Sequence, residues 1–306
     1  MSITNRHWSV GVVFFALVAF ILLYRPYSKQ LEWGIYDPNK YFADSHAFGL
    51  EMMYSAWNGD AASSIGQQLR SIKSRGRIPV LTLEPWPVDP KYTTDQTNLS
   101  GADNFLSLIS NGAYDDSISS SCAQIKSVGS NVYVRFGHEM ELKQNRYPWQ
   151  NKNPDDFIQA YRHFVTVCKS YASNALFVWS PAGDAGLSKY WPGDQFVDVI
   201  GLSVFSFGNL EEQQYGRRLS FAELMTPKYD RVYIYHKPVM IAELGVTGTD
   251  DYKSDWLKFV SEKRWLYPRL DSVIYFNSPD SIGAWPEGLG TPDWSLHSAD
   301  MLHFLP

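Results

Sequence analysis

Two glutamates each follow a short apolar run, in a position where a charged side chain is costly to bury. Glu139 follows NVYVRF and the pair Gly137–His138, and Glu243 follows VMIA. A buried ionised carboxylate must be paired or must shift its pKa. A structural ion pair, for instance with Arg135, explains one such glutamate about as well as chemistry does. Two of them, with Trp residues around them, favour chemistry.

Paired carboxyl groups beside aromatic rings are typical of glycoside hydrolysis. One carboxylic acid protonates the leaving glycosidic oxygen, and the other group attacks the anomeric carbon or activates a water that does so. Trp and Tyr rings stack on the C–H faces of pyranose rings, and 11 Trp and 19 Tyr are many for a chain of 306 residues. The residues alone give no distance between the carboxyl groups, so they leave the stereochemistry open.

The elements that must position these groups follow a regular order along the chain. Eight short runs, mostly continuous in apolar residues and rich in Val and Ile, predict parallel strands buried on both faces. They are Trp33–Tyr36, Phe48–Tyr54, Ile78–Leu83, Val132–Phe136, Leu176–Trp179, Val197–Phe205, Val239–Ala242 and Ser272–Phe276.

Amphipathic segments separate the strands and predict helices. The clearest is Asp155–Tyr171, which Pro154 and two acidic residues open. The others are Ala61–Ser74, Tyr114–Val128, Leu210–Tyr229 and Asp251–Arg264. Strands that alternate with helices in this way predict an α/β protein, a (β/α)₈ TIM barrel. A doubly wound sheet is the alternative, but the turn YDPNKYFAD after the first strand lacks a glycine-rich phosphate-binding fingerprint.

In such a barrel the active-site residues lie where strands end and the following loops begin. Besides the two glutamates, we predict substrate contacts at residues in or just after these strand ends: Trp86, Arg135, His138, Trp149, Trp179, Phe205, Asn277 and Trp285. Trp86 and Trp149 lie next to prolines, so loop packing is an alternative for both. Glu84 in TLEPW reads more simply as a loop acid before Pro85.

Five motifs, in this order, resemble glycoside hydrolase family 26. They are RFGHEM, YPW, FVWSP, VDVIGLSVF and KPVMIAELG, and the resemblance covers nearly all of the chain from Trp33 to Trp294. Family members are mostly β-mannanases, with some β-1,3-1,4-glucanases, built on a (β/α)₈ barrel of a clan of retaining enzymes. His-Glu after the fourth strand together with Glu-x-Gly after the seventh is a fairly specific combination.

The resemblance implies a role for each matching residue. Glu139 matches the acid/base and keeps its proton in the resting enzyme, and Glu243 matches the ionised nucleophile, which implies a retaining double displacement. His138 matches a histidine that lines the subsite at the cleaved bond, and Arg135 an arginine that pairs with a carboxylate inside the barrel. Trp179 and Trp285 stand where family members have aromatic platforms.

Two positions depart from the family pattern. Glu141 stands where mannanases commonly have Asn, which predicts an extra negative charge near the site. Phe205 stands where a tyrosine often hydrogen-bonds the nucleophile, and Ser203 or Tyr275 could substitute for it. Both departures concern the preference for mannan more than the hydrolase assignment.

The composition excludes several other functions. The formal net charge of −5 argues against nucleic acid as a partner. The seven His are scattered and no Cys/His cluster has zinc spacing, so we expect no metal and no cofactor. Cys122 and Cys168 lie in different predicted helices, and the sequence leaves open whether they form a disulfide.

Trp8–Tyr24 reads WSVGVVFFALVAFILLY, an apolar segment without a charge. It is short for a transmembrane helix and long for the core of a signal peptide, and no small-x-small cleavage site follows it. We therefore expect an uncleaved anchor and tether at residues 1–30 and an exported catalytic domain at residues 31–306. This predicts a single-pass membrane protein with a periplasmic or extracellular domain; secretion after signal cleavage is the alternative.

The favoured hypothesis is an endo-acting β-glycanase that cleaves β-1,4-mannan or a β-1,4 or mixed-linkage glucan. A barrel that binds polysaccharide without cutting it, as an accessory subunit of an exopolysaccharide synthesis machine, is the second hypothesis. A transglycosylase that shares the covalent intermediate is the third. An anchored single domain suits the trimming of a polymer made by the same cell, in association with its polysaccharide synthase.

Overall fold

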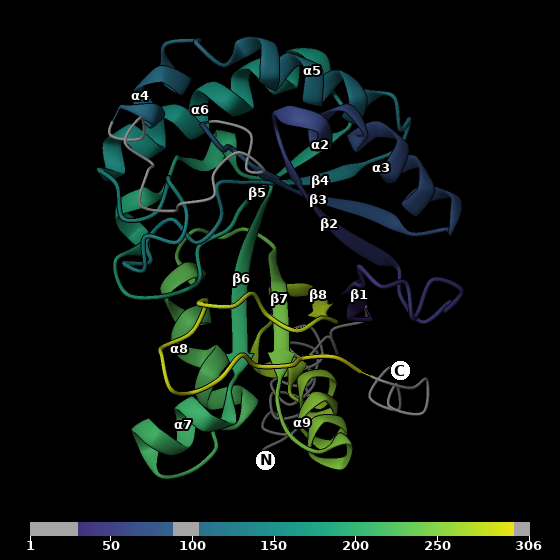
Figure 1. Cartoon of the computed structure of the whole chain (residues 1–306), viewed down its shortest axis with the longest axis vertical. Coiled ribbons are helices and arrows are strands. Elements are labelled where there is room, and N and C mark those ends of the chain that lie inside the picture. Colours follow the sequence, from purple (N-terminus) through teal and green to yellow (C-terminus); the bar gives the residue numbers. More distant parts are fainter. Residues whose placement is uncertain (1–29, 88–103, 297–306) are drawn as a thin grey trace, which may run out of the picture. The chain divides into compact units, whose positions relative to one another are not determined.

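A closed barrel of eight parallel strands forms the centre of the protein. The computed structural model describes residues 30–87 and 104–296. Each strand pairs with the next along the chain, and the last pairs with the first (Figure 1). The strands are β1 (Glu32–Tyr36), β2 (Leu50–Ala56), β3 (Ile78–Glu84), β4 (Val132–Phe136), β5 (Ala175–Trp179), β6 (Val199–Ser206), β7 (Val239–Val246) and β8 (Leu270–Phe276). The predicted (β/α)₈ class is confirmed.

Helices follow the strands on the outside of the barrel, as expected of this fold. In the described residues they are α2 (Gly59–Ser63), α3 (Ile65–Ser74), α4 (Phe105–Ser110), α5 (Asp115–Lys126), α6 (Pro154–Tyr171), α7 (Gly208–Tyr215), α8 (Phe221–Tyr233) and α9 (Asp250–Glu262). Short 3₁₀ turns are η3 (Leu187–Tyr190), η4 (Asp194–Phe196) and η5 (Arg264–Leu266).

Two segments that the sequence predicts as single helices are each divided in two. The segment predicted at Leu210–Tyr229 breaks at Gly216, whose φ of 67° lies in the left-handed region. A new helix then begins at Ser220, which forms a capping box with Glu223. The segment predicted at Ala61–Ser74 likewise breaks at Ser64, between α2 and α3. In both segments the residues that end or begin a helix divide it, although the apolar periodicity continues through the break.

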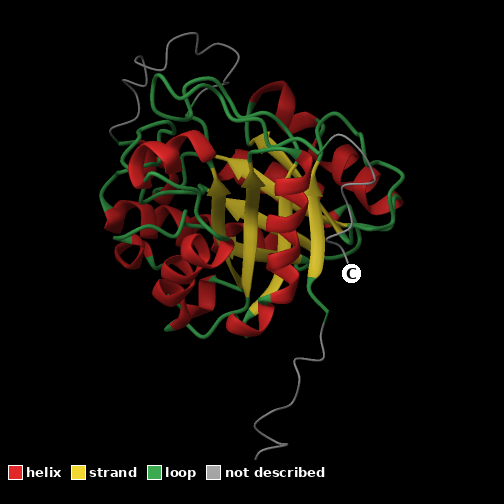
Figure 2. Cartoon of the chain, turned by 90° about the horizontal axis from the view of Figure 1, so that it is seen from below, coloured by secondary structure: helices red, strands yellow, loops and turns green. Residues whose placement is uncertain are grey.

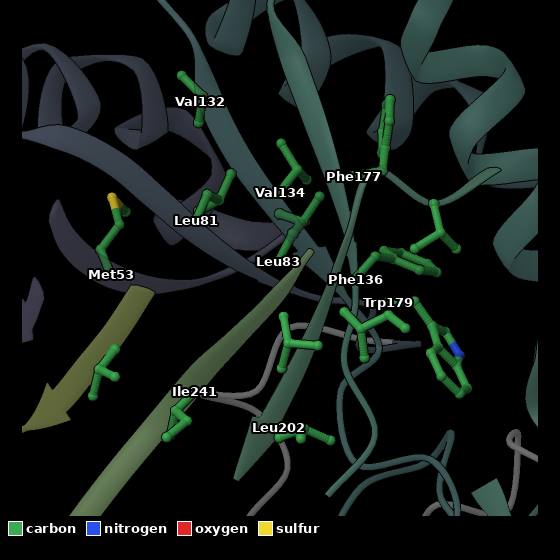
Figure 3. Packing of buried hydrophobic residues seen from close by; sticks show 14 of the residues in the cluster. Met53, Leu81, Leu83, Val132, Val134, Phe136, Phe177, Trp179, Leu202 and Ile241 are labelled. Atoms are coloured by element: carbon green, nitrogen blue, oxygen red, sulfur yellow. The ribbon is translucent and has the colours of Figure 1, made fainter. Parts of the chain in front are cut away.

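All strands point toward the same end of the barrel, which we call the mouth; we call the other end the foot (Figure 2). A small apolar cluster fills the interior, with Leu50, Met52, Val80, Met240, Ala242 and Ile274. Tyr36, Tyr54 and Phe276 lie against this cluster and line the cavity at the mouth. A larger cluster fills the space between the strands and the helices (Figure 3).

Residues 31–306 form a compact unit of their own. The described part of the chain has no helix that is both long and apolar enough to cross a membrane. The predicted anchor Trp8–Tyr24 lies outside the described residues.

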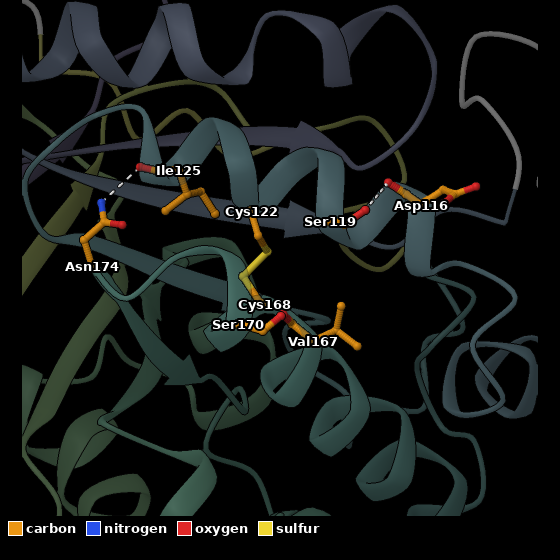
Figure 4. The surroundings of a disulfide bond; sticks show 8 residues. All are labelled: Asp116, Ser119, Cys122, Ile125, Val167, Cys168, Ser170 and Asn174. Carbon is orange, nitrogen blue, oxygen red and sulfur yellow. Dashed lines mark hydrogen bonds between the residues drawn. A yellow bond between two sulfur atoms is a disulfide. The ribbon is translucent and has the colours of Figure 1, made fainter.

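A disulfide joins Cys122 of α5 to Cys168 of α6 (Figure 4). Both cysteines are fully buried, and their Cα atoms are 5.4 Å apart. The bond connects two neighbouring helices that are 46 residues apart in the sequence. The covalent loop that it closes contains β4. The sequence alone leaves open whether these two cysteines pair, and the structure shows that they do.

We expect the double variant Cys122→Ala/Cys168→Ala to fold but to lose about 3–4 kcal/mol of unfolding free energy, because the disulfide restricts a long loop of the unfolded chain. Urea unfolding of residues 30–306 measures the loss. A reducing agent should destabilise the wild type by a similar amount and leave the variant unchanged. Equal stability of the two proteins would contradict the expectation.

Candidate active site

Glu139 is positioned by a tight turn directly after β4. Gly137 and Glu139 both have positive φ, at 57° and 56°, and a Cβ on Gly137 would lie 3.3 Å from the ring of Phe157. The first position therefore requires glycine, and the second holds a glutamate in a conformation that costs it free energy. Two hydrogen bonds fix the turn: Glu139 N donates to Ser180 O at 2.8 Å, and Trp149 Nε1 donates to His138 O at 2.7 Å.

Glu243 is positioned by an irregularity in β7. Leu202 of β6 pairs with Ile241, but the next residue, Ser203, pairs with Glu243, so Ala242 is passed over. The register between β7 and β8 also shifts between Ile241 and Leu244. Such bulges redirect a side chain and are common beside active sites. Glu243 consequently lines the cavity from the middle of β7, a strand whose residues are all buried.

Arg135 lies beneath the cavity and joins several strands. Its guanidinium is fully buried, and Nη1 lies 2.6 Å from Oε1 of Glu243. Nε donates to Ser180 Oγ at 2.7 Å and Nη1 to Thr82 Oγ1 at 3.3 Å. Since an arginine in a protein stays charged, it holds the carboxylate of Glu243 in one place.

Ser203 brings the two glutamates into one site. It is the register partner of Glu243, which places their Cα atoms about 5 Å apart. Its hydroxyl donates to Oε1 of Glu139 at 2.7 Å. Burial, and next the negative charge of Glu243, raises the pKa of Glu139 to about 7. Glu139 is therefore largely protonated below neutral pH, in part because it lies beside the carboxylate of Glu243.

The cavity at the mouth has a volume of about 480 Å³. Aromatic rings of Tyr36, Tyr54, Tyr147, Phe205, Phe276 and Trp285 line it together with both glutamates. Burial, and next the charge of Glu243, raises the pKa of Tyr36 to about 12 and raises that of Tyr54 well above its usual value, so both phenols keep their protons. The cavity thus offers flat apolar faces and hydroxyl groups next to two carboxyl groups.

His138 also lines the cavity, and its ring lies 4.7 Å from that of Tyr147. Burial, followed by the charges of Arg135 and Arg146, lowers the pKa of His138 well below its usual value. Nδ1 is buried without a hydrogen-bond partner among the described residues. The ring that lines the cavity is therefore a neutral imidazole.

Phe205 and Trp285 are the two predicted aromatic contacts that the structure places in the cavity wall. Their ring centroids lie 6.1 Å apart, and Nε1 of Trp285 donates to Asp280 at 2.7 Å. Neither residue proposed to replace the missing tyrosine contacts Glu243 through its hydroxyl. Ser203 donates to Glu139 instead, and Tyr275 donates to the carbonyl of Trp294.

Trp179 does not lie in the cavity. Its side chain is fully buried in the layer between strands and helices (Figure 3), with ring centroids 5.0 Å from Trp191 and 5.8 Å from Tyr235. A ring without exposed surface cannot stack on a sugar. The prediction of a platform at Trp179 is therefore wrong in this structure.

Besides Arg135, which lies beneath the cavity, three other predicted contacts lie outside the cavity lining. Trp149 is fully buried and stacks on Tyr147 at 4.7 Å, so it supports a ring that does line the cavity. Asn277 is fully buried and links two loops, because it accepts from Leu296 N and donates to Asp37. Trp86 is partly buried and donates to Glu84 at 3.0 Å. All three are supporting residues here.

Glu141 has a different role from the predicted one. It is buried outside the cavity lining, and its carboxylate accepts three backbone N–H groups from Ala182, Gly183 and Asp184 at 2.9–3.2 Å. Its charge therefore holds the loop after β5. Its effect on the pKa of Glu139 comes after those of burial, Glu243, Arg135 and Ser203.

The sequence analysis undervalued Glu84 and missed several cavity residues, including Tyr36, Tyr54, Tyr147 and Phe276. Glu84 ends β3 and lines the cavity, and burial raises its pKa. Arg146 and Asp280 also line it and form an ion pair of 3.7 Å between the loops after β4 and β8. The strand-end position was the available signal for Glu84. Nothing in the sequence shows that the loop with Arg146 meets the loop with Asp280.

The sequence predicts no metal site, and a metal site would need several ligating side chains close together. Among the residues that the structure describes, no group of three or more His, Cys, Asp or Glu side chains is arranged to hold a metal ion.

A barrel of this kind with two carboxyl groups at its mouth defines the class of (β/α)₈ glycoside hydrolases. The sequence model of glycosyl hydrolase family 26 matches residues 97–259, more than half of the chain. The chain belongs to this family. The matched residues contain both Glu139 and Glu243.

Similarity to curated proteins agrees with this assignment. The chain is 24% identical over 246 residues to endoglucanase H of Acetivibrio thermocellus, covering 72% of this chain and 25% of that protein. It is 30% identical over 105 residues to β-1,3-xylanase TXYA of a Vibrio species, covering 32% of this chain and 22% of that protein. The chain thus spans about a quarter of the length of these relatives.

Solved structures share the fold. The family 26 β-mannanase BoMan26A of Bacteroides ovatus superposes with a TM-score of 0.58 at 16% identity, covering 81% of each chain. GH26C of Muricauda sp. MAR_2010_75 gives a TM-score of 0.63 at 16% identity, covering 82% of this chain and 79% of that chain.

The hydrogen bond from Ser203 gives a test of the pKa of Glu139. A general acid works while protonated, so kcat/KM should fall as the pH rises through about 7. Ser203→Ala removes a donor to the ionised form, which should raise this pKa and move the fall to higher pH. The control Ser281→Ala changes a cavity-lining serine whose hydroxyl does not bind Glu139. A fall at unchanged or lower pH in Ser203→Ala would contradict the assignment.

Proposed function

We propose that residues 31–306 form an endo-acting β-glycanase domain that cleaves a β-linked polysaccharide with retention of anomeric configuration. The observation that supports it most is the difference between the two glutamates. Glu139 has a pKa of about 7 and can donate a proton, whereas Glu243 is held beside the buried guanidinium of Arg135. Environments that differ in this way separate an acid from a nucleophile.

In the first step the carboxylate of Glu243 attacks the anomeric carbon, and the carboxylic acid of Glu139 gives its proton to the departing glycosidic oxygen. This produces a glycosyl ester of Glu243 and a shortened sugar with a free hydroxyl. In the second step Glu139, now ionised, removes a proton from water, whose oxygen attacks the same carbon. The carboxylate of Glu243 leaves, and both glutamates regain their starting states.

Arg135 acts by position in this scheme. It lies beneath Glu243 and is held by Ser180 and Thr82. The carboxylate loses its charge when the glycosyl ester forms, and the guanidinium stabilises that charge again when the ester is cleaved. Removing Arg135 would leave Glu243 as an unpaired buried charge.

The charges of the cavity favour a neutral polymer. Five acidic side chains and two basic ones line it in the described residues, and the two basic side chains are both paired: Lys228 with Asp184 at 3.0 Å and Arg146 with Asp280 at 3.7 Å. A polyuronate would find no unpaired Lys or Arg side chain in this described lining to bind its carboxylates. Mannan, β-glucan or xylan would meet aromatic faces and hydroxyl groups, and the names of the relatives include enzymes of these types.

The cellular location is part of the proposal. A disulfide persists in an oxidising compartment, so the Cys122–Cys168 bond supports export of the domain. The uncharged segment Trp8–Tyr24 supplies an anchor in the sequence. We propose a single-pass membrane protein with its catalytic domain in the periplasm or outside the cell.

We expect residues 30–306 to release reducing ends from one of three polymers: β-mannan, mixed-linkage β-glucan or β-1,3-xylan. Glu243→Ala should lose activity by about 10³-fold or more on every substrate. Glu139→Ala should lose as much on the polymer but far less on an aryl glycoside with an acidic leaving group, which needs no proton. Trp179→Phe is a control, because that ring lies outside the cavity.

Other outcomes separate the alternatives. Binding of a polymer without any cleavage by the folded wild type would favour the non-hydrolytic accessory protein. Longer products at high acceptor concentration would favour the transglycosylase. Full activity of Glu243→Ala would show that the nucleophile is elsewhere.

A further inference from the structure

Exposed apolar side chains gather at one part of the foot of the barrel. Five of the ten large apolar side chains that are exposed in the described residues lie at the ends of α8 and α9 or in the turns that lead to β7 and β8: Tyr233, Ile234, Phe259, Trp265 and Leu266. We call them the α8–α9 apolar surface. β7 and β8 are paired, and α8 and α9 are neighbours in the helical layer (Figure 1). Arg269 connects the two turns, since its Nη1 donates to Tyr233 O at 2.9 Å.

The chemistry of this surface matches the boundary between lipid headgroups and acyl chains. Trp265 is 69% exposed and Ile234 65%, which is costly in water. Trp and Tyr are the residues that concentrate at this boundary. Two basic side chains lie over aromatic rings of the surface: Arg269 is 4.4 Å from the ring of Tyr233 and Lys263 is 5.8 Å from that of Phe259. Such side chains can lie along an apolar layer with the charge in water.

Two of the four basic side chains named at this surface are paired with acidic ones. Glu262 lies 3.7 Å from Lys258, and Asp271 lies 4.0 Å from Arg264, so acidic and basic groups are interspersed beside it. Attraction to a lipid surface would therefore come from apolar burial, with little dependence on anionic headgroups or on salt.

The chain enters the barrel at the same end. Leu31 precedes β1, which pairs with β8, so the first described residues lie at the foot beside the strand that η5 leads into. Six residues, 25–30, connect this point to the uncharged segment Trp8–Tyr24, and they reach at most about 20–25 Å. A domain of this length is about 50 Å across. A bilayer that holds the segment is therefore within reach of the foot and beyond reach of the mouth.

We propose that the α8–α9 apolar surface docks on the lipid bilayer, so that the cavity faces away from the membrane toward its polymer. The proposal depends on the anchoring part of the proposed function and not on its chemistry. The docked arrangement fixes the distance of the mouth from the bilayer at about the diameter of the barrel.

Flotation of residues 30–306 with phosphatidylcholine vesicles tests the surface without the anchor; these residues contain the complete barrel and its core. We expect the wild type to float with the vesicles at both low and high salt. Trp265→Ser/Ile234→Ser should reduce the bound fraction about tenfold, because the two largest exposed areas of the surface are lost. The matched control Ile282→Ser/Tyr215→Ser removes side chains that are 95% and 60% exposed elsewhere and should float like the wild type.

Three results would overturn the proposal: no flotation of the wild type, equal flotation of the Trp265/Ile234 variant, or binding that requires anionic lipid and disappears in salt. A dimer in lipid-free solution that the same variant dissociates would also overturn it, in favour of a second copy of the chain. Glu243→Ala should float normally, so a failed hydrolase assignment and a failed docking surface give different results.

The full chain in phosphatidylcholine nanodiscs gives the second measurement. Backbone amides of residues 233–237 and 263–267 should exchange hydrogen several-fold more slowly than in free residues 30–306, whereas residues 278–288 at the mouth should be unchanged. Protection of the mouth instead of the foot would reverse the proposed orientation.

Discussion

The ion pair between Arg135 and Glu243 is the constraint on which the site depends. Two charges buried under a cavity cost several kcal/mol in lost hydration unless each is well paired. Arg135 meets this cost with partners from three other parts of the barrel: Thr82 on β3, Ser180 after β5 and Glu243 on β7. Ser180 does more, because its carbonyl also accepts the N–H of Glu139. The same short segment therefore holds both the nucleophile and the turn that carries the acid.

The acid depends on that arrangement in two ways. A glutamate with positive φ costs roughly 1 kcal/mol or more, so the hydrogen bond to Ser180 and the bond from Trp149 to His138 must offset it. Partial burial then favours the neutral carboxyl, and the charge of Glu243 adds to this effect. Arg135 acts in the opposite direction, but its guanidinium is already beside Glu243. One buried cation thus pairs directly with Glu243, while burial and the charge of Glu243 outweigh its effect on the pKa of Glu139.

The strand order, the barrel class and the place of Glu139 just after β4 could be predicted, because continuous Val- and Ile-rich runs mark buried parallel strands. The sequence predicts Glu243 at the end of the seventh strand, whereas the structure has it within β7. Side-chain direction could not. A strand buried on both faces lacks the polar–apolar alternation that shows which residues point inward. Trp179 and Ser180 are adjacent, yet the first lies in the helical layer and the second reaches Arg135. At Glu243 the register passes over Ala242, a shift that no local pattern in the sequence indicates. β4 and β8 lie on opposite sides of the closed ring, so Arg146 meets Asp280 only through the loops that follow these strands at the mouth.

A cavity at the mouth also limits where the stability of the barrel can come from. The interior cluster is small and ends below Tyr36 and Tyr54, so most apolar burial must occur between strands and helices. The disulfide lies in that outer layer, away from the residues that line the cavity. The strand beginnings at the foot take no part in the chemistry, so their turns are free to expose apolar side chains without disturbing the glutamates. Catalysis and attachment can therefore occupy opposite ends of one barrel, because the parallel strands place every loop of one kind at one end.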